Sequence, residues 1–452
     1  MRKDLDKTMD LLKKYDQEHL LHFYSFLSEE EKSELINEIL SIDFDLVQDT
    51  YNGVKCDDSE KVDNEFKPLK AKSLKLYTEE ERVNLYNIGM DALTKGRVAV
   101  YLVAGGQGTR LGHKGPKGTF SIGLPSGKSL FQLQCERLIY LSKECKKYIP
   151  LYIMTSVDNH QDTVSFFEEH NYFGYPKSMI MFFKQRTMPA VGEDGKILLS
   201  DKGRIVMSSN GNGGCFLALK ESGALEDMKS KGVEWLFIYG IDNALVRVAD
   251  PLFIGFTISS KQLAASKVVE KKYAEEKVGV LCYRNNKPAI VEYSEMQNII
   301  ASEVDSEGKL VYSNANILNH LLNVKFIEKI IEEPLPLHIA HKKIEHLDSH
   351  GMMVVPTEPN GYKFEYFLFD IFEKLEDMAA LEVEREEEFA PVKNKEGEDS
   401  PETAKKLILN LHKKWLTDAG FNKEELEKNQ IEVSPLTSYY GDNLKGKNIN
   451  EI

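Results

Sequence analysis

The chain has 452 residues, of which 42% are hydrophobic and 29% charged, and its formal net charge is −14. This length exceeds one typical core and predicts two or three domains, and the composition excludes a wholly disordered or fibrous chain. The acidic balance argues against a general nucleic-acid binder, which needs many Lys and Arg side chains for phosphate contacts. It is compatible with a nucleotide enzyme that gathers its cations locally.

Cysteine usage and hydropathy indicate the compartment. The 5 cysteines are scattered without close pairs, which predicts reduced thiols rather than a disulfide framework or a zinc knuckle. The N-terminus is charged, and no apolar run reaches membrane-spanning length. We therefore expect a cytoplasmic monomer that binds neither membranes nor nucleic acids.

The first part of the chain predicts helices. Residues 1–45 have helical spacing, and Ser28 with Glu31 forms a capping box for a helix that runs to Leu40. The polar stretch from Asp49 to Lys75 predicts an irregular connection, which leads into a helix over about 79–93.

From about residue 97, strands and helices alternate, which predicts an α/β domain with a mostly parallel sheet. Ligands in such sheets bind beyond the carboxyl ends of the strands. A β-hairpin, with its turn over 284–287, could cover a sugar pocket. The predicted strands are 98–103, 151–155, 179–183 and 235–241, the helices 129–146 and 161–170, and the hairpin strands 279–283 and 288–293.

A glycine-rich, cationic loop follows the first of these strands. Its glycines allow sharp turns and close backbone approach, and its cations favour a polyphosphate ligand over a plain turn. The spacing matches neither the dinucleotide fingerprint nor, at Gly123–Ser129, a Walker A loop. The glycines are Gly105, Gly106, Gly108 and Gly112, and the basic residues are Arg110, His113, Lys114 and Lys117.

Several other residues have competing interpretations. Asp242 ends an apolar strand, where a carboxylate either caps a turn or binds a ligand. We interpret the acidic run 384–388 as a solvated helix end, and 393–401 as a linker. His338 and His341 lack the companions of a metal site, so we interpret them as packing or solvated residues.

The chain resembles eukaryotic-type UDP-N-acetylglucosamine pyrophosphorylases over most of its length after the first helices. The resemblance begins with Ala104–Gly112 and continues in the family's order. The matching segments are Ala104–Gly112, Gly115–Gly118, Gly123–Lys128, Phe182–Gln185, Gly211–Gly214, Asp242–Asn243, Val246–Phe256, Lys267–Lys271, Val291–Glu295, Asn314–Ile317, Lys363–Glu365, Phe369–Asp370, Phe389–Asn394 and Ser434–Ser438.

The resemblance implies a Rossmann-like nucleotide-diphospho-sugar transferase fold: a mixed, mostly parallel doubly wound sheet with an N-terminal helical lobe and a small C-terminal lobe. We place the domain boundaries at 1–95, 96–388 and 389–452. The implied reaction converts UTP and N-acetylglucosamine 1-phosphate to UDP-N-acetylglucosamine and pyrophosphate by in-line attack on the α-phosphorus. Bringing two anions together requires cations, backbone amides and a metal, here Mg²⁺ or Mn²⁺.

The resemblance also assigns roles to individual residues. Glu292 could equally be an exposed strand residue, and Lys117 a solvated loop lysine. Asp242 would hold the metal, and Asp370 is a candidate second ligand. The catalytic residues would be Arg110, Lys117 and Lys393; the nucleotide-binding residues Ala104, Gly105, Gly106, Gln185, Gly211 and Lys363; and the sugar-binding residues Asn212, Glu292 and Asn316.

Two alternatives remain at this stage. One is a UDP-glucose or broad-specificity UDP-sugar pyrophosphorylase, although Gln107 and Asn314–Ile317 favour the acetylhexosamine branch, where N-acetylgalactosamine 1-phosphate could also be a substrate. The other is a non-catalytic nucleotide-binding scaffold. The chain also departs from many relatives by carrying Asn210 where they have an acidic residue.

Overall fold

The computed structural model describes residues 2–56, 64–293, 295–296, 298–333 and 335–452, and it divides into two compact units. Unit 1 comprises residues 1–63, 185–214 and 335–368, and unit 2 comprises 64–184, 215–334 and 369–452. These units differ from the predicted domains, because the N-terminal helices associate with two segments inserted from later in the chain. None of the described helices combines the length and apolarity that a membrane crossing needs.

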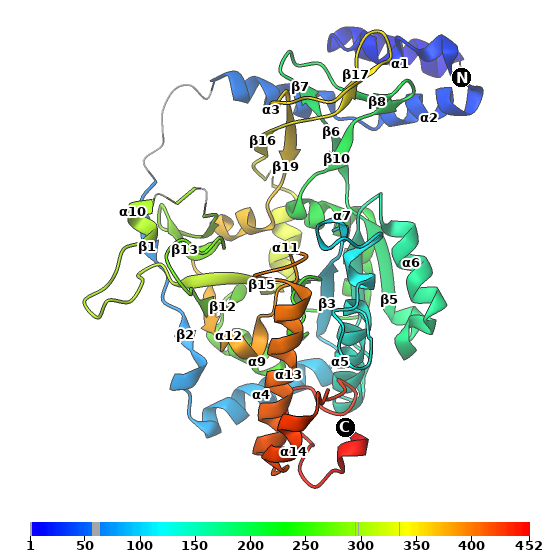
Figure 1. Ribbon diagram of the computed structural model, residues 1–452. Coiled ribbons are helices and arrows are strands. Elements are labelled where there is room, and N and C mark those ends of the chain that lie inside the picture. The colour runs from blue at the N-terminus through cyan, green and yellow to red at the C-terminus, as the bar shows by residue number, and fades with distance from the viewer. Residues whose placement is uncertain (1, 57–63, 294, 297, 334) are drawn as a thin grey trace. The chain divides into compact units, whose positions relative to one another are not determined.

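Unit 1 packs three helices against short strands (Figure 1). Gln17 and Tyr51 donate hydrogen bonds to the carbonyls of Gly195 (2.9 Å) and Glu193 (2.6 Å), which joins the helices to the first inserted segment. Ser28 and Glu31 form the predicted capping box. The elements are α1 Arg2–Lys14, α2 Glu29–Leu40, α3 Phe44–Cys56, β6 Thr187–Pro189, β7 Val191–Gly192, β8 Leu199–Asp201, β9 Arg204–Ile205, β10 Met207–Ser209, β16 His338–Lys342, β17 His346–Leu347, β18 Met353–Val354 and β19 Gly361–Glu365.

Unit 2 is built on an 11-stranded sheet with the order β2-β20-β12-β15-β11-β3-β4-β5, to which β13, β14 and β1 are joined. Strands β11, β3, β4 and β5 are mutually parallel, as are β12, β20 and β2, and β15 runs antiparallel between β11 and β12. The strands are β1 Phe66–Pro68, β2 Lys72–Ser73, β3 Val98–Val103, β4 Leu151–Thr155, β5 Ile180–Lys184, β11 Trp235–Gly240, β12 Ala264–Glu270, β13 Val280–Arg284, β14 Lys287–Val291, β15 Asn314–Asn323 and β20 Ala379–Glu382.

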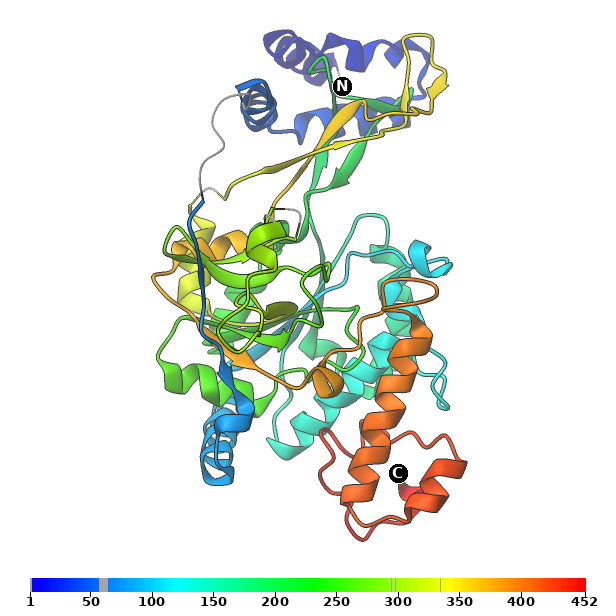
Figure 2. The same cartoon turned by 60° about the vertical axis from the view of Figure 1, so that its left-hand side comes forward.

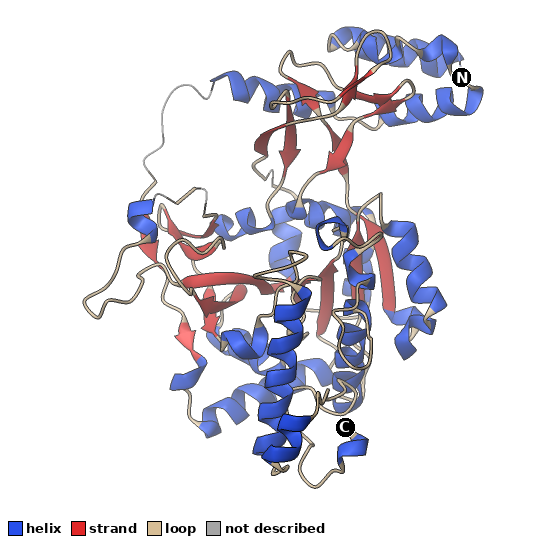
Figure 3. Cartoon of the chain, viewed as in Figure 1, coloured by secondary structure: helices blue, strands red, loops and turns tan. Residues whose placement is uncertain are grey.

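Helices lie on both sides of this sheet (Figure 3). The predicted α/β fold with a mixed, mostly parallel sheet and N-terminal helices is therefore confirmed, because apolar strands such as β3 and β11 are buried on both faces. The helices are α4 Glu79–Thr94, α5 Leu130–Glu144, α6 His160–Glu169, α7 Cys215–Glu221, α8 Ala224–Ser230, α9 Pro251–Ser260, α10 Asn298–Ala301, α11 Val324–Ile331, α12 Arg385–Glu388, α13 Pro401–Asp418 and α14 Lys423–Lys428.

The local predictions hold for most of unit 2. Strands β3 and β4 have the predicted bounds, and β5 and β11 differ by one residue. The predicted hairpin is β13–β14, whose turn residues Asn285 and Asn286 both have positive φ (52° and 64°), as a type I′ turn requires.

One predicted irregular segment is partly regular. Helix α3 extends to Cys56, and β1 and β2 interrupt the predicted connection, while residues 57–63 lie outside the described ones. The helix was missed although Phe44, Val47 and Tyr51 have helical spacing and are buried, because the prediction followed the polar composition after Asp49. Short strands such as β1 exist only through pairing, here with β13.

The segment after residue 388 belongs to unit 2 (Figure 2). Ala404, Ile408 and Leu411 of α13 are part of the same hydrophobic core as β3 and α5. Tyr439 donates a hydrogen bond to the carbonyl of Val248 (2.9 Å). The last turns have a small core of their own around Leu416 and Leu426.

Candidate active site

Two parallel strands bring the glycine-rich loop and Asp242 to one edge of the sheet. β3 and β11 are neighbours, with Val103 opposite Gly240, and the amide of Ile241 donates to the carbonyl of Val103 (3.3 Å). The loop leaves β3 at Ala104, and Asp242 follows β11 by two residues. Both therefore lie beyond the carboxyl ends, where open α/β sheets bind ligands.

The glycine-rich loop folds back on itself through backbone hydrogen bonds. The amide of Lys117 donates to the carbonyl of Gly106 (3.1 Å), and the amide of Gly108 donates to the carbonyl of Gly115 (2.9 Å). Gly112 and Gly115 have φ values of 72° and 121°, which other residues rarely adopt. A Cβ at Gly106 would meet no atom within 4 Å, so its backbone is open to a ligand.

The cations of this loop are available for a ligand. Arg110 is exposed and Lys117 half-buried, and within the described residues neither side chain has a hydrogen-bond or ion-pair partner. Such a site of open backbone and unneutralised charge is suited to phosphate oxygens.

A second segment, residues 388–393, which we call the strap, lies antiparallel to the residues around Asp242. The amide of Val392 donates to the carbonyl of Asp242 (2.9 Å), and the amide of Ala390 to Oδ1 of Asn243 (3.0 Å). Lys393 ends the strap, and its Nζ lies 3.5 Å from Oδ2 of Asp399. The strap thus brings Lys393 to the edge of the sheet where Asp242 lies.

The carboxylate of Asp242 is half-buried and, among the described residues, has no hydrogen-bond or ion-pair partner. A Cβ at Gly240 would lie 2.8 Å from Oδ1 of Asp242, so this carboxylate lies close to the last residue of β11. In the described part of the chain, no group of three or more His, Cys, Asp or Glu side chains could hold a metal. One carboxylate fits Mg²⁺, which is often held by one or two carboxylates together with substrate phosphates and water.

The predicted sugar-binding residues of unit 2 lie beside one another. A Cβ at Gly279 would lie 3.2 Å from Oε1 of Glu292, and the carbonyl of Gly279 accepts from the amide of Asn316 (2.8 Å). Burial and, less strongly, Glu295 raise the pKa of Glu292, whereas Lys393 lowers it. Glu292 is therefore half-buried and within electrostatic reach of the strap, and not an exposed strand residue.

The other four predicted binding residues lie in unit 1. Gln185 is buried and donates to Oγ of Ser209. Gly211 has a φ of 76°, and a Cβ there would lie 2.4 Å from the carbonyl of Tyr366. That carbonyl also accepts from the amide of Gly213 (2.8 Å), so residues 211–213, which include Asn212, pack against the end of β19, the strand that holds Lys363.

Position 210, where this chain has Asn and many relatives have an acidic residue, is buried. Asn210 is 1% exposed, and no described residue donates to its Oδ1. A Cβ at Gly214 would lie 2.2 Å from that oxygen. An aspartate in this environment would bury a charge, which is costly unless a cation pairs with it.

The remaining sequence interpretations have mixed outcomes. Asp370 is buried and lies within electrostatic reach of Arg284, and its role as a second metal ligand stays a prediction. His338 stacks on Phe367 with 4.0 Å between ring centroids, and His341 lies 2.9 Å from Glu193, so both make ordinary packing or surface contacts. The interpretation of 384–388 as a solvated helix end is wrong for Glu388, which is 2% exposed.

Comparison with known proteins identifies the family. Residues 45–442 match the family described as UTP--glucose-1-phosphate uridylyltransferase. The UDP-N-acetylglucosamine pyrophosphorylase of Saccharomyces cerevisiae is 41% identical over 97% of both chains. The chain belongs to the family of eukaryotic-type UDP-N-acetylglucosamine pyrophosphorylases. The UDP-N-acetylhexosamine pyrophosphorylase-like protein 1 of Mus musculus is 37% identical over 96% of this chain and 93% of its own.

Solved structures agree with this family. The uridine diphosphate N-acetylglucosamine pyrophosphorylase from Trypanosoma brucei, in complex with an inhibitor, has a TM-score of 0.83 and 30% identity over 98% of this chain and 94% of its own. A UDP-glucose pyrophosphorylase mutant from Leishmania major reaches a TM-score of 0.60 with 19% identity over 76% of this chain and 72% of its own, which shows a shared fold alone.

Three residues that support the site were missed from the sequence of this pyrophosphorylase-family chain. Asn159 donates to the carbonyl of Ala104 (3.0 Å) and thereby holds the start of the glycine-rich loop. Asn243 bridges to the strap. Arg137 is buried on α5 and donates to the carbonyls of Ala244 (2.8 Å) and Val246 (3.1 Å). Asn159 and Asn243 both follow strand ends, which was the available signal.

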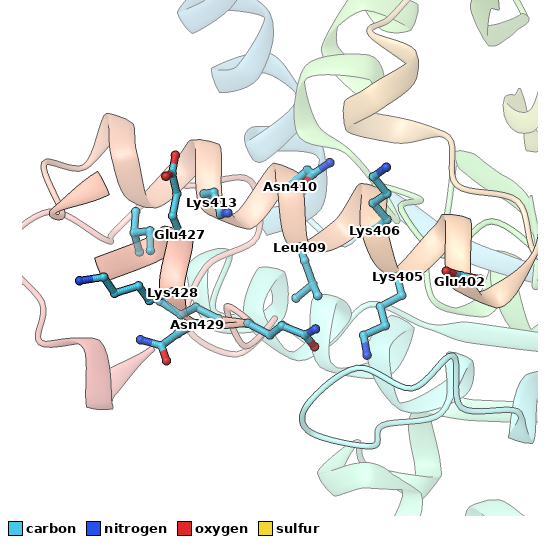
Figure 4. A pocket seen from close by; sticks show the side chains of 12 residues that line it. Glu402, Lys405, Lys406, Leu409, Asn410, Lys413, Glu427, Lys428 and Asn429 are labelled. Atoms are coloured by element: carbon cyan, nitrogen blue, oxygen red, sulfur yellow. The ribbon is translucent and has the colours of Figure 1, made fainter. Parts of the chain in front are cut away.

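A separate cavity of about 530 Å³ lies between α13 and residues 426–431, with the lining side chains shown in Figure 4. Lys405 and Leu409 of α13 lie on the side of the helix that faces residues 428–430. The described residues that line it include none of the predicted site residues. We therefore place the candidate active site at the sheet edge and not in this cavity.

Proposed function

We propose that this chain transfers the uridylyl group of UTP to N-acetylglucosamine 1-phosphate, forming UDP-N-acetylglucosamine and pyrophosphate. The observation that carries the proposal is the convergence of the glycine-rich loop, Asp242 and Lys393 at adjacent strand ends. The S. cerevisiae relative named for this product, which matches nearly the whole chain, supports the choice of sugar.

The reaction is a phosphoryl transfer between two anions, so positioning and charge neutralisation dominate its barrier. Arg110 and Lys117 would neutralise pyrophosphate, and the open backbone at Gly106 in the same loop supports this role. Lys393 would offset the charge of the attacking sugar phosphate. Glu292 and Asn316 would accept and donate hydrogen bonds to sugar hydroxyls or the acetamido group.

Asp242 would hold Mg²⁺, or Mn²⁺ in its place, when substrate is bound. Such an ion would neutralise charge on the phosphate oxygens and help to orient them. In unit 1, Gln185, Gly211 and Lys363 would contact the nucleotide and Asn212 the sugar. The protein is proposed to act as a cytoplasmic monomer without membrane or nucleic-acid partners.

A pyrophosphate-release assay with UTP, Mg²⁺ and each sugar 1-phosphate in turn tests this function. We expect release with N-acetylglucosamine 1-phosphate to exceed that with glucose 1-phosphate. Preference for glucose 1-phosphate would instead indicate a UDP-glucose pyrophosphorylase. Absence of release with every sugar would indicate a nucleotide-binding scaffold.

The variant Lys117→Ala tests the assigned cation. We expect kcat to fall by about 10²-fold or more, because one preorganised stabilising group is lost where charge develops. The melting temperature should stay near that of the wild type, since no described residue bonds the Lys117 amine. Lys114→Ala is the matched control on the same loop. Wild-type turnover in Lys117→Ala would contradict the role of this lysine.

A further inference from the structure

Lys267 of β12 is a charged side chain with no access to water. It is 0% exposed, and its Nζ lies 2.6 Å from Oδ2 of Asp250. The same Nζ donates to Oε2 of Glu388, which is also buried. A lysine this buried is retained only when it is paired, and here it joins two carboxylates from distant parts of the chain.

Both acidic residues also take part in hydrogen bonds that order the nearby backbone. Oδ1 of Asp250 accepts from the amide of Leu252 (3.0 Å) and caps α9. Glu388 begins the strap, and its carbonyl accepts from Nδ2 of Asn243 (2.7 Å). Lys267 therefore connects the start of α9 and the sheet to the segment that ends at Lys393.

Arginine 247 extends the same buried network. Its Nη2 donates to Oε2 of Glu387 (2.8 Å), and its Nη1 lies 3.6 Å from Oε1 of Glu388. Two basic side chains thus approach Glu388 from different sides. The strap is tied at its first residue by charge and at Ala390 and Val392 by hydrogen bonds to residues 242–244.

We propose that Lys267 is a positioning residue that holds the strap in register with Asp242 and so keeps Lys393 at the reacting phosphates. This inference rests on the proposed function. Its physical basis is that loss of Lys267 leaves Asp250 and Glu388 as neighbouring buried carboxylates, whose repulsion is relieved when the strap moves away. A displacement of about 1 Å at a catalytic group is enough to slow a reaction by about 10²-fold.

A double-mutant cycle between Lys267 and Lys393 tests the proposal, with kcat and KM measured by pyrophosphate release. Lys267→Met should lower kcat by about 10- to 100-fold and change KM for UTP by less than about twofold. In a Lys393→Ala background, the same substitution should lower kcat by less than about twofold, because the group that Lys267 positions is already absent. Multiplicative losses would overturn the proposal.

The matched control is Lys128→Met, which also removes a largely buried lysine. Nζ of Lys128 lies 2.7 Å from Oε2 of Glu136, with side chains 16% and 5% exposed, and neither residue is on the strap. Any effect of this variant on kcat should be equal in the two backgrounds. An effect that also vanishes with Lys393→Ala would overturn the proposal, because it would show that general destabilisation produces the coupling.

A second cycle covers the case in which Lys267→Met does not fold. Glu388→Gln keeps an acceptor for Lys267 and avoids an uncompensated lysine, because Asp250 still pairs with it. Its loss of kcat should again disappear in the Lys393→Ala background, and a persistent loss would overturn the proposal. If the wild-type protein released no pyrophosphate with any sugar 1-phosphate, the proposed function would be contradicted. Failure of the proposed function is therefore distinguishable from failure of the Lys267 proposal.

Discussion

Glu292 illustrates how a single residue of the site is tuned. It follows β14 directly, is half-buried, and has a pKa raised first by burial and then by Glu295. A raised pKa means that the native state binds the proton more tightly than the unfolded chain does. The stability that the protonated carboxyl contributes below its ordinary pKa is therefore lost as pH rises through the raised value.

Glu292→Gln should thus change stability and binding in opposite directions. The melting temperature of the variant relative to wild type should increase between about pH 4 and pH 7, because the amide has no charge to bury. KM for N-acetylglucosamine 1-phosphate should rise by about tenfold or more, because a charged acceptor is lost. Thermal unfolding across pH and Michaelis kinetics measure both, and an unchanged KM would contradict sugar binding by Glu292.

At the scale of elements, α4 and α9 cross in close contact. Gly89 and Gly255 let the two helices meet backbone to backbone, because a Cβ at either would lie 1.8 Å from a carbonyl oxygen of the other helix. Those carbonyls belong to Pro251 and Leu85. Helix α9 begins at the Asp250 cap that Lys267 contacts, so this packing also fixes one end of the buried ion network.

Gly255→Ala should force these helices apart. We expect the free energy of unfolding to fall by about 1–3 kcal/mol or more, as in other overpacked interiors. Urea denaturation of the full-length protein, monitored by circular dichroism, measures the decrease in the free energy of unfolding. Asn84→Ala, exposed on α4, is the control and should change the free energy by less than about 0.7 kcal/mol. Equal stability of the two variants would show that the helices adjust without cost.

At the scale of the whole molecule, the C-terminal segment packs into the core of unit 2. His412 on α13 is buried, and its Nδ1 accepts from the amide of Val433 (3.1 Å). Burial, and then the charge of Arg137, lower the pKa of His412 to about 3. Arg137 also holds residues 244–246, so the last helices and the Asp242 edge share one buried environment.

This lowered pKa predicts acid sensitivity. The native state binds the His412 proton less tightly than the unfolded chain, so stability present above about pH 6.5 is lost as pH falls. His412→Asn keeps the acceptor and should reduce the slope of unfolding free energy between about pH 5.5 and 4 by about 1.4 kcal/mol per pH unit. Urea titrations at several pH values measure it.

Patterns that depend on neighbouring residues were predictable from the chain. The Ser28 cap, the turn over 284–287 and the buried run of β3 act over a few positions, and the structure has each of them. The pairing of β1 was not predictable, because this short strand depends on β13, far along the sequence.

The sequence by itself determined the α/β class, the glycine-rich loop after β3 and the residue types suited to phosphate, because these follow from local periodicity and side-chain chemistry. Only the tertiary structure decided that helices α1 to α3 associate with two later segments and that Glu388 is buried rather than solvated. Lys267, Asp250 and Glu388 show the reason. A buried charge is costly unless folding brings oppositely charged partners to it. These partners lie far apart in the sequence, so local patterns do not reveal the pairing.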